Sequence, residues 1–110
     1  MAVQDLTFDT GEATLKPTSD ETLKQIATLM QEHPGLTLLV EGHTDDAGSY
    51  EANMTLSKER AAAVKEALVQ THGIDAARLK TKGQGSTQPA ASNDTEQGRA
   101  ENRRVELVKL

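Results

Sequence analysis

The spacing of hydrophobic residues predicts a strand followed by an amphipathic helix in the first third of the chain. Residues 3–8 carry apolar side chains at Val3, Leu6 and Phe8 and end at the turn-forming stretch 9–11, which predicts a short strand. A helix is expected to begin near 17–20, where proline, hydroxyl and carboxylate side chains mark a helix start, and to end at 33–35. Its apolar residues share one helical face. They are Leu23, Ile26, Ala27 and Met30.

The middle of the chain predicts a second strand, a polar loop and a long helix. Residues 36–40 are a nearly unbroken aliphatic run, which is typical of a strand buried on both faces. The run leads into 41–48, a polar loop with glycines near both ends, and then into a helix at about 49–71. The start of such a helix offers free backbone N–H groups and the positive end of its dipole to a ligand.

Two further strands, separated by a long loop, complete the predicted order β-α-β-α-β-β. Residues 78–82 are the weaker strand, 83–98 are rich in Gly, Ser, Gln and Asn and predict a surface loop, and 103–110 alternate like a strand. This order favours a mixed four-stranded sheet with the helices packed on one face, an α/β sandwich. A length of 110 residues suits one domain, so 1–110 is expected to form a single domain.

The composition excludes several classes of function. A formal charge of -5 and an aromatic content of 2% argue against nucleic acid as a partner, because nucleic-acid binding depends on clustered basic and stacking aromatic residues. The absence of cysteine excludes thiolate catalysis, disulfides and Cys-based zinc sites. No apolar run approaches the ~20 residues of a membrane-spanning helix. The first five residues do not resemble a signal peptide, so an export signal or anchor is expected outside this chain.

The helix that follows the polar loop carries an arginine on the stripe that should face the core. Arg60 lies four residues before Val64 and eight before Leu68, and a guanidinium there is costly without a hydrogen-bonded anion. Asp45 and Asp46 in the preceding loop are the candidate partners. A partly open Asp–Arg couple suits a zwitterion, whose ammonium meets the carboxylate and whose carboxylate meets the guanidinium. An amino acid or a peptide with a free amino-acid end would fit.

The same residues also allow other interpretations. On spacing alone, Asp45 is consistent with a helix cap and Arg60 with a structural ion pair. His43 beside the two aspartates is compatible with a metal site or a hydrolase, but the sequence offers no clear second ligand. Ser57 has no histidine placed to activate it as a nucleophile. We therefore expect no metal, no cofactor and no catalysis.

Several short motifs occur along the chain in a fixed order. The stretch 40–61 contains a GHTD loop, a glycine, an asparagine and then LS-x-x-RA on the predicted helix. Before it come Phe8-Asp9 and Leu15-Lys16-Pro17, and after it come G-I-x-x-x-R from Gly73 and GRA-x-NRRVE at 98–106. Together these motifs resemble the OmpA C-terminal-like family, and the resemblance covers nearly the whole chain, from about residue 6 to 110.

The resemblance implies noncovalent binding of the peptide stem of peptidoglycan, typically at its meso-diaminopimelate residue. It places the family's key aspartate at Asp45, for the ammonium, and its key arginine at Arg60, for the carboxylate. It implies further pocket residues in Asn53, Leu56, the backbone around Asp9 and Thr10, and one arginine of the Arg103-Arg104 pair, with Arg103 favoured. A short first strand and Ala47, where many members have threonine or another small polar residue, depart from the pattern.

The implied function is that of a cell-wall anchor rather than an enzyme. Through a parent protein that carries any membrane attachment, the domain would tether an outer-membrane or envelope protein to peptidoglycan in the periplasm. A periplasmic protein–protein interaction module of the same fold is the alternative, and a homodimer stays open. Such a module would need a contiguous exposed apolar patch, which the sequence does not obviously show.

Overall fold

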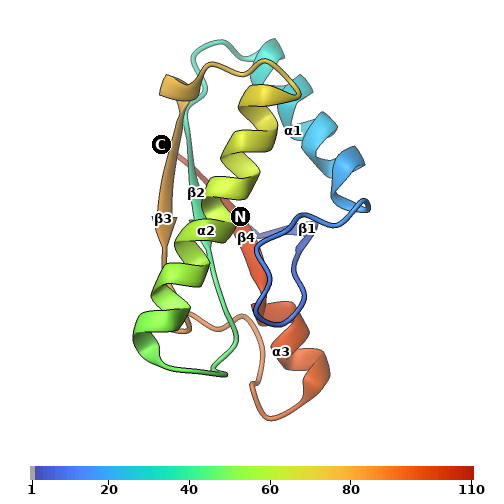
Figure 1. Ribbon diagram of the computed structural model, residues 1–110. Helices are drawn as coiled ribbons and strands as arrows, with labels where there is room; N and C mark the ends of the chain where they lie inside the picture. The colour runs from blue at the N-terminus through green and yellow to red at the C-terminus, as the bar shows by residue number, and fades with distance from the viewer. Residues whose placement is uncertain (1) are drawn as a thin grey trace.

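The computed structural model describes residues 2–110 and, from residue 6 onward, their side chains. The described chain forms four strands and three α-helices, with one short 3-10 helix (Figure 1). The elements are β1 Ala2–Thr7, α1 Ser19–Glu32, β2 Leu38–Gly42, α2 Tyr50–Gln70, η1 Ala76–Arg78, β3 Leu79–Gly83, α3 Glu96–Asn102 and β4 Arg104–Lys109. The predicted order of strands and long helices is confirmed. None of the helices in this range is long and apolar enough to span a membrane.

The sheet has the strand order β1-β4-β2-β3, so the last strand of the chain lies inside it. β4 runs antiparallel to both β1 and β2, whereas β2 and β3 are parallel and are joined by α2. The predicted mixed four-stranded sheet is therefore confirmed. Because Gly42 at the end of β2 pairs with Val105, the start of β4 lies beside the carboxyl end of β2.

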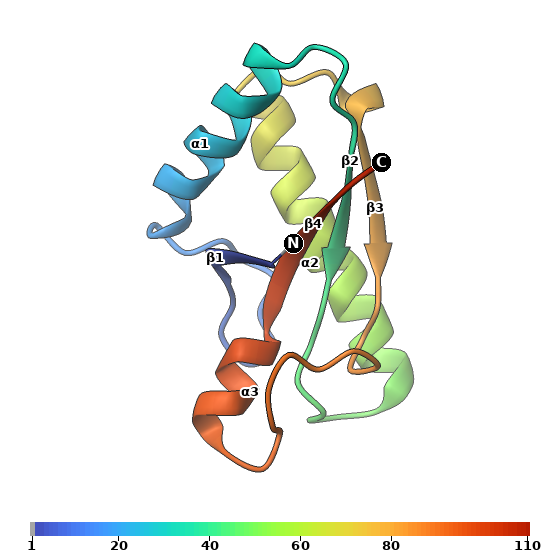
Figure 2. The same cartoon turned by 180° about the vertical axis from the view of Figure 1, so that it is seen from behind.

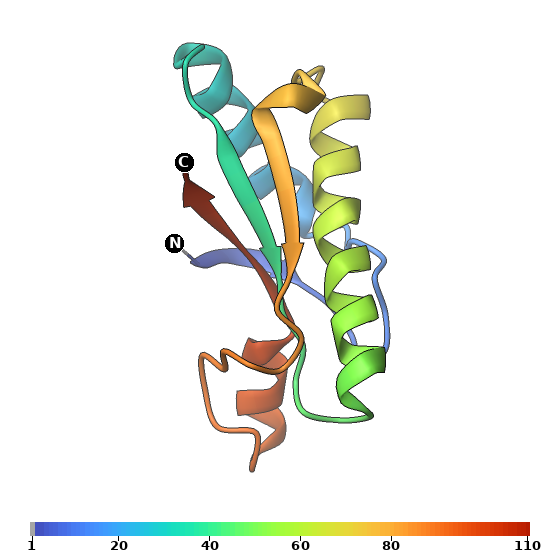
Figure 3. The same cartoon turned by 90° about the vertical axis from the view of Figure 1, so that its left-hand side faces the viewer.

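Helices α1 and α2 cover one face of the sheet, as predicted. α2 lies along β2 and β3, which Figure 3 shows from the side, and α1 packs against β1 and α2. Figure 2 shows the molecule from behind, where β2 and β4 pass in front of α2. Buried aliphatic side chains fill the space between the two layers. They include Leu23, Ile26, Met30, Val40, Val64, Leu68, Val105 and Leu107.

Helix α3 begins inside the segment that was predicted to be a loop. It has seven residues and begins after Thr95, whose hydroxyl oxygen accepts the N–H of Gly98 at 3.0 Å. Glycine lowers helix propensity, yet a Cβ at Gly98 would lie 1.8 Å from the carbonyl oxygen of Ser92, so the fold needs glycine there. Hydrophobic periodicity misses this helix because it is short and polar.

The carboxyl end of β2 lies very close to α2. A Cβ at Gly42 would lie 1.8 Å from the backbone oxygen of Ser57, so only glycine permits this approach. β2 starts two residues later than predicted, because the N–H of Leu36 bonds to the carbonyl of His33 at 2.9 Å. Its outward residues Leu39 and Glu41 are only half-buried, which corrects the expectation of burial on both faces. The contact at Gly42 fixes the first half of α2 beside the loop that follows β2.

Candidate functional site

A pocket opens between the loop after β2, the first half of α2 and the turn after β1. Its volume is ≈ 400 Å³. It is lined by Thr10, Gly11, Asp45, Ala47, Gly48, Ala52, Asn53, Leu56 and Arg60. Five of the seven residues predicted from the sequence are in this lining, and the other two, Asp9 and Arg103, make hydrogen bonds to members of it. The hydrogen bond between Asp45 and Arg103 alone joins residues that are 58 positions apart in the chain.

Arg60 lies at the base of this pocket and binds three backbone carbonyls. Its Nε donates to Glu12 at 2.8 Å, and its two terminal nitrogens donate to His43 at 2.9 Å and to Asp9 at 3.0 Å. Its guanidinium carbon also lies 5.1 Å from the centroid of the Phe8 ring, within the range of a cation–π contact. Arg60 therefore connects α2 to the turn after β1 and to the loop after β2.

The charge of Arg60 is buried without an ion-pair partner in the part of the chain that the structure describes. The residue has 0% exposure. Burial lowers the pKa of Arg60 to about 10; the negative charge of Asp45 opposes this shift, and the positive charge of Arg103 adds to it. At neutral pH the guanidinium is therefore still protonated, and a ligand anion in the pocket would stabilise it.

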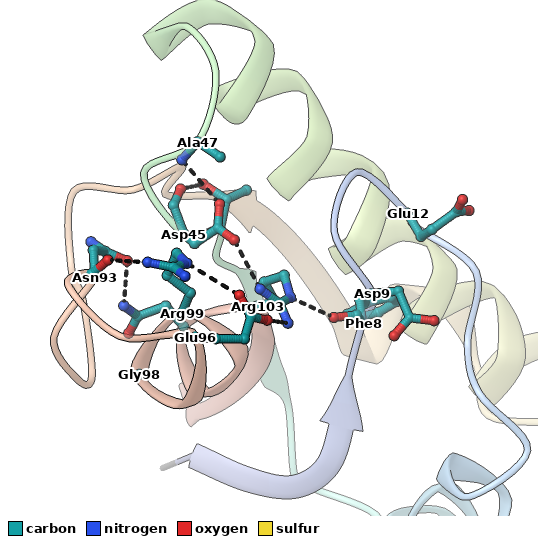
Figure 4. Close-up of polar contacts among 12 residues, drawn as sticks. Phe8, Asp9, Glu12, Asp45, Ala47, Asn93, Glu96, Gly98, Arg99 and Arg103 are labelled. Atoms are coloured by element: carbon teal, nitrogen blue, oxygen red, sulfur yellow. Dashed lines mark hydrogen bonds and ion pairs between the residues drawn. The ribbon is translucent and has the colours of Figure 1, made fainter.

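Asp45 pairs with Arg103 instead of Arg60, which corrects the partner expected from the sequence. Nη1 of Arg103 donates to Oδ2 of Asp45 at 3.0 Å, and Oδ1 of Asp45 accepts the N–H of Ala47 at 3.0 Å (Figure 4). Asp45 is only 5% exposed, but it remains part of the pocket lining. Sequence spacing favoured Arg60 because it is near in the chain, whereas Arg103 is brought to Asp45 only by the pairing of β4 with β2.

The structure places Arg103, not Arg104, beside Asp45. Arg103 also donates from Nε to the carbonyl of Phe8 at 3.0 Å. Arg104 makes an ion pair with Glu106 and donates to the carbonyl of Gln88. Of the two arginines, Arg103 therefore bonds to a residue of the pocket lining, whereas these partners of Arg104 lie outside it.

Asp9 contributes its backbone to the site rather than its carboxylate. Its carbonyl oxygen accepts from Arg60 and also from the N–H of Glu12 at 3.0 Å, which closes a turn. Gly11 in that turn has a φ of 71°, a conformation that favours glycine. The Asp9 carboxylate instead pairs with Lys16 at 3.2 Å and is exposed. This turn forms one wall of the pocket.

His43 and Ser57, the residues behind the metal and hydrolase interpretations, do not belong to the pocket lining. The Ser57 hydroxyl donates to the carbonyl of Met54 at 2.9 Å and accepts the N–H of Gly85 at 2.9 Å. Nε2 of His43 lies 3.6 Å from the Glu106 carboxylate, and the imidazole is 1% exposed. Among the described residues, no three potential ligands lie close enough together to hold a metal ion.

The buried imidazole of His43 should make the domain less stable in acid. Burial and then the charge of Arg104 lower the pKa of His43 from its ordinary value of 6.5, against the opposing effect of Glu106 and Glu41. The unfolded chain consequently binds this proton more readily than the folded chain does. The stabilisation is complete above pH 6.5 and is lost as the pH falls from there through the folded-state pKa.

Denaturant unfolding at about pH 7.5 and about pH 5 measures this effect. The denaturant concentration at the unfolding midpoint of wild type should be lower at about pH 5 than at about pH 7.5, and His43→Gln should remove part of that decrease. His33→Gln changes an exposed histidine, should leave the decrease of the midpoint unchanged and serves as the control. If the midpoint decreased equally in His43→Gln and in wild type, the loss of stability in acid would not come from His43.

The site also contains a residue that the sequence did not indicate. Glu96, in the first turn of α3, accepts a hydrogen bond from Nη2 of Arg103 at 2.9 Å (Figure 4). Glu96 directly follows Thr95, the N-cap of α3. The sequence could have indicated Glu96 only if this short helix had been predicted.

The described chain is thus an α/β sandwich whose ligand-sized pocket holds an acidic and a basic side chain. Its residues 7–103 match the sequence profile of the OmpA family. The chain belongs to the OmpA family, which confirms the resemblance seen in its motifs.

Individual relatives agree with this assignment. The probable lipoprotein YiaD of Escherichia coli (strain K12) is 46% identical over 103 residues, which cover 94% of this chain and 47% of the relative. The peptidoglycan-binding protein ArfA of Mycobacterium bovis is 39% identical over 94% of this chain and 31% of its own length. The crystal structure of the peptidoglycan-associated lipoprotein from Burkholderia pseudomallei superimposes with a TM-score of 0.90 at 31% identity, covering 96% of this chain and 88% of that one. The chain spans less than half the length of the two curated relatives.

Proposed function

We propose that this domain binds the peptide stem of peptidoglycan noncovalently and holds the free end of meso-diaminopimelate between Asp45 and Arg60. The observation that carries the proposal is the presence of one carboxylate and one guanidinium in a single pocket of ≈ 400 Å³. A free amino-acid end presents one ammonium and one carboxylate, so it complements both charges. Similarity to a protein named for peptidoglycan binding and to a peptidoglycan-associated lipoprotein supports this class of ligand.

Arg60 would bind the ligand carboxylate. A guanidinium has five N–H donors, and backbone carbonyls take three of those of Arg60, which leaves two. Because Arg60 has 0% exposure, the carboxylate reaches these donors only after residues that cover the guanidinium shift. In exchange the buried cation gains an anionic partner, and a pair in which both groups are ionised is stronger than a hydrogen bond from the guanidinium to a neutral carbonyl.

The remaining lining suits the rest of a diaminopimelate side chain. Asp45 would accept from the ammonium, because a carboxylate is an acceptor on both oxygens and can serve more than one donor. Asn53 offers an amide that both donates and accepts, and half-buried Leu56 offers apolar surface to the methylene groups of the ligand. The pocket would thereby bind the charged end and the short aliphatic chain of the ligand together.

The binding would serve to anchor an envelope protein to the cell wall in the periplasm. Relatives named as a lipoprotein and as outer membrane porins support attachment through other parts of a longer protein. A free amino-acid end has few atoms, so the affinity of one domain should be modest. Many identical stems on one polymer would add avidity. This role requires no chemical step and no cofactor.

Calorimetric titration with two stem peptides tests the proposal. One peptide ends in meso-diaminopimelate, and the other carries lysine in its place, which keeps the ammonium and removes the carboxylate. Saturable binding of the first should be at least about tenfold tighter, since the lost carboxylate leaves Arg60 without its anion. Equal affinity for both would refute the role of Arg60. A folded sample that binds neither peptide would instead favour a protein–protein interaction module.

A further inference from the structure

Arg103 links two acidic residues that belong to different parts of the fold. Its Nη1 donates to buried Asp45 at 3.0 Å, and its Nη2 donates to Glu96 at 2.9 Å. Its Nε donates to the carbonyl of Phe8, which holds the guanidinium plane in place (Figure 4). The two carboxylates therefore share one cation, and Arg103 itself is only 7% exposed.

This arrangement decides the charge at the Asp45 end of the pocket. Asp45 and Arg103 alone sum to zero, since one carboxylate and one guanidinium cancel. Glu96 adds one negative charge directly against Arg103, while Arg99, which pairs with the other oxygen of Glu96, brings the sum over the four side chains to zero. A ligand ammonium needs a negative partner, and a carboxylate fully neutralised by an arginine attracts it weakly.

The surroundings of Glu96 keep its carboxylate ionised and directed toward Arg103. Hydrogen bonds from Arg103 and then Arg99 lower the pKa of Glu96. Nε of Arg99, one helical turn further on, donates to Oε2 of Glu96 at 3.2 Å, so each carboxylate oxygen has its own arginine. The side chain is 66% exposed, however, so solvent weakens its effect on the pocket.

We infer that Glu96 is a positioning residue that offsets the charge of Arg103, makes the Asp45 end of the pocket more negative than it would be without Glu96, and thereby strengthens its preference for a ligand ammonium. The inference rests on the proposed function, because it deepens the account of the same pocket. Glu96 does not touch the ligand in this account: it acts through Arg103, whose charge it balances and whose guanidinium it holds beside Asp45. α3 would then be part of the binding site, although it lies outside the pocket lining.

The test compares two ligands on three proteins. The ligands are the stem peptide ending in meso-diaminopimelate and the same peptide with the terminal ammonium replaced by hydrogen. The proteins are wild type, Glu96→Gln and Glu101→Gln, the last being an exposed acid on the same helix. Glu96→Gln removes the charge but keeps an amide of the same size, so α3 should remain folded.

Glu96→Gln should weaken binding of the ammonium peptide about three- to fivefold, which is the range of one partly exposed charge pair. Its affinity for the peptide without the ammonium should equal that of wild type, and Glu101→Gln should change neither. An equal loss for both peptides would mean that Glu96 only supports the structure, and no loss for either would also overturn the inference. If wild type binds neither peptide, the proposed function itself fails. This outcome differs from an equal loss for both peptides and from no loss for either, which overturn only the role of Glu96.

Discussion

Arg60→Ala is expected to abolish detectable binding of the stem peptide and to lower the free energy of unfolding by about 3–5 kcal/mol. The change removes three charge-assisted hydrogen bonds and leaves the carbonyls of Asp9, Glu12 and His43 without this donor. It also empties the volume of a long, fully buried side chain. Since domains of this size are stable by about 5–15 kcal/mol, the variant should still fold.

Arg78→Ala provides the matched control for this variant. Arg78 likewise donates to three carbonyls, those of Met30, His33 and Leu36, but it does so at the opposite end of β2 from the pocket. Denaturant unfolding should show a loss of stability in both variants, whereas calorimetry should show a loss of binding only in Arg60→Ala. Full binding by folded Arg60→Ala would remove the proposed mechanism.

The fold followed from the sequence where hydrophobic periodicity is strong. α1 has an apolar stripe along its length, α2 has one in its second half, and both have clear end signals, so both were predicted to within about two residues. α3 was not predicted, because its stability comes from the Thr95 cap and from tertiary contacts such as those of Arg103 and Asn102, not from an apolar face. The start of β2 was misplaced because an aliphatic run does not show where a turn ends.

The sequence indicated which residues lie at the pocket, but not which of them bond to one another. Asp45 and Arg60 stand out by motif and by position on a helical stripe, and the pocket contains both. Which arginine pairs with Asp45 depends on the β2–β4 register, a contact between strands far apart in the chain. The carbonyl ligands of Arg60 have no sequence signal at all, because any residue has a backbone carbonyl.

Asp45→Asn should reduce affinity for the stem peptide by about 30-fold or more while leaving the fold largely intact. Truncating one member of a buried charged pair at a binding site typically costs about 2–5 kcal/mol. The amide has nearly the shape of the carboxylate, and its oxygen can still accept from the Ala47 N–H or from Arg103. The substitution removes one negative charge from the pocket itself, so the attraction for the ligand ammonium is lost.

Asp46→Asn is the matched control for this prediction, because Asp46 is the neighbouring acid and is exposed to solvent. Calorimetry should show a change within about twofold for Asp46→Asn, since an exposed charge is screened. Asp45→Asn and Glu96→Gln change the charge of the pocket by the same amount, yet the first removes the group that touches the ammonium and the second a group behind Arg103. A loss in Asp45→Asn that is clearly larger than in Glu96→Gln would therefore place direct contact at Asp45. Wild-type affinity in folded Asp45→Asn would mean that another group binds the ammonium.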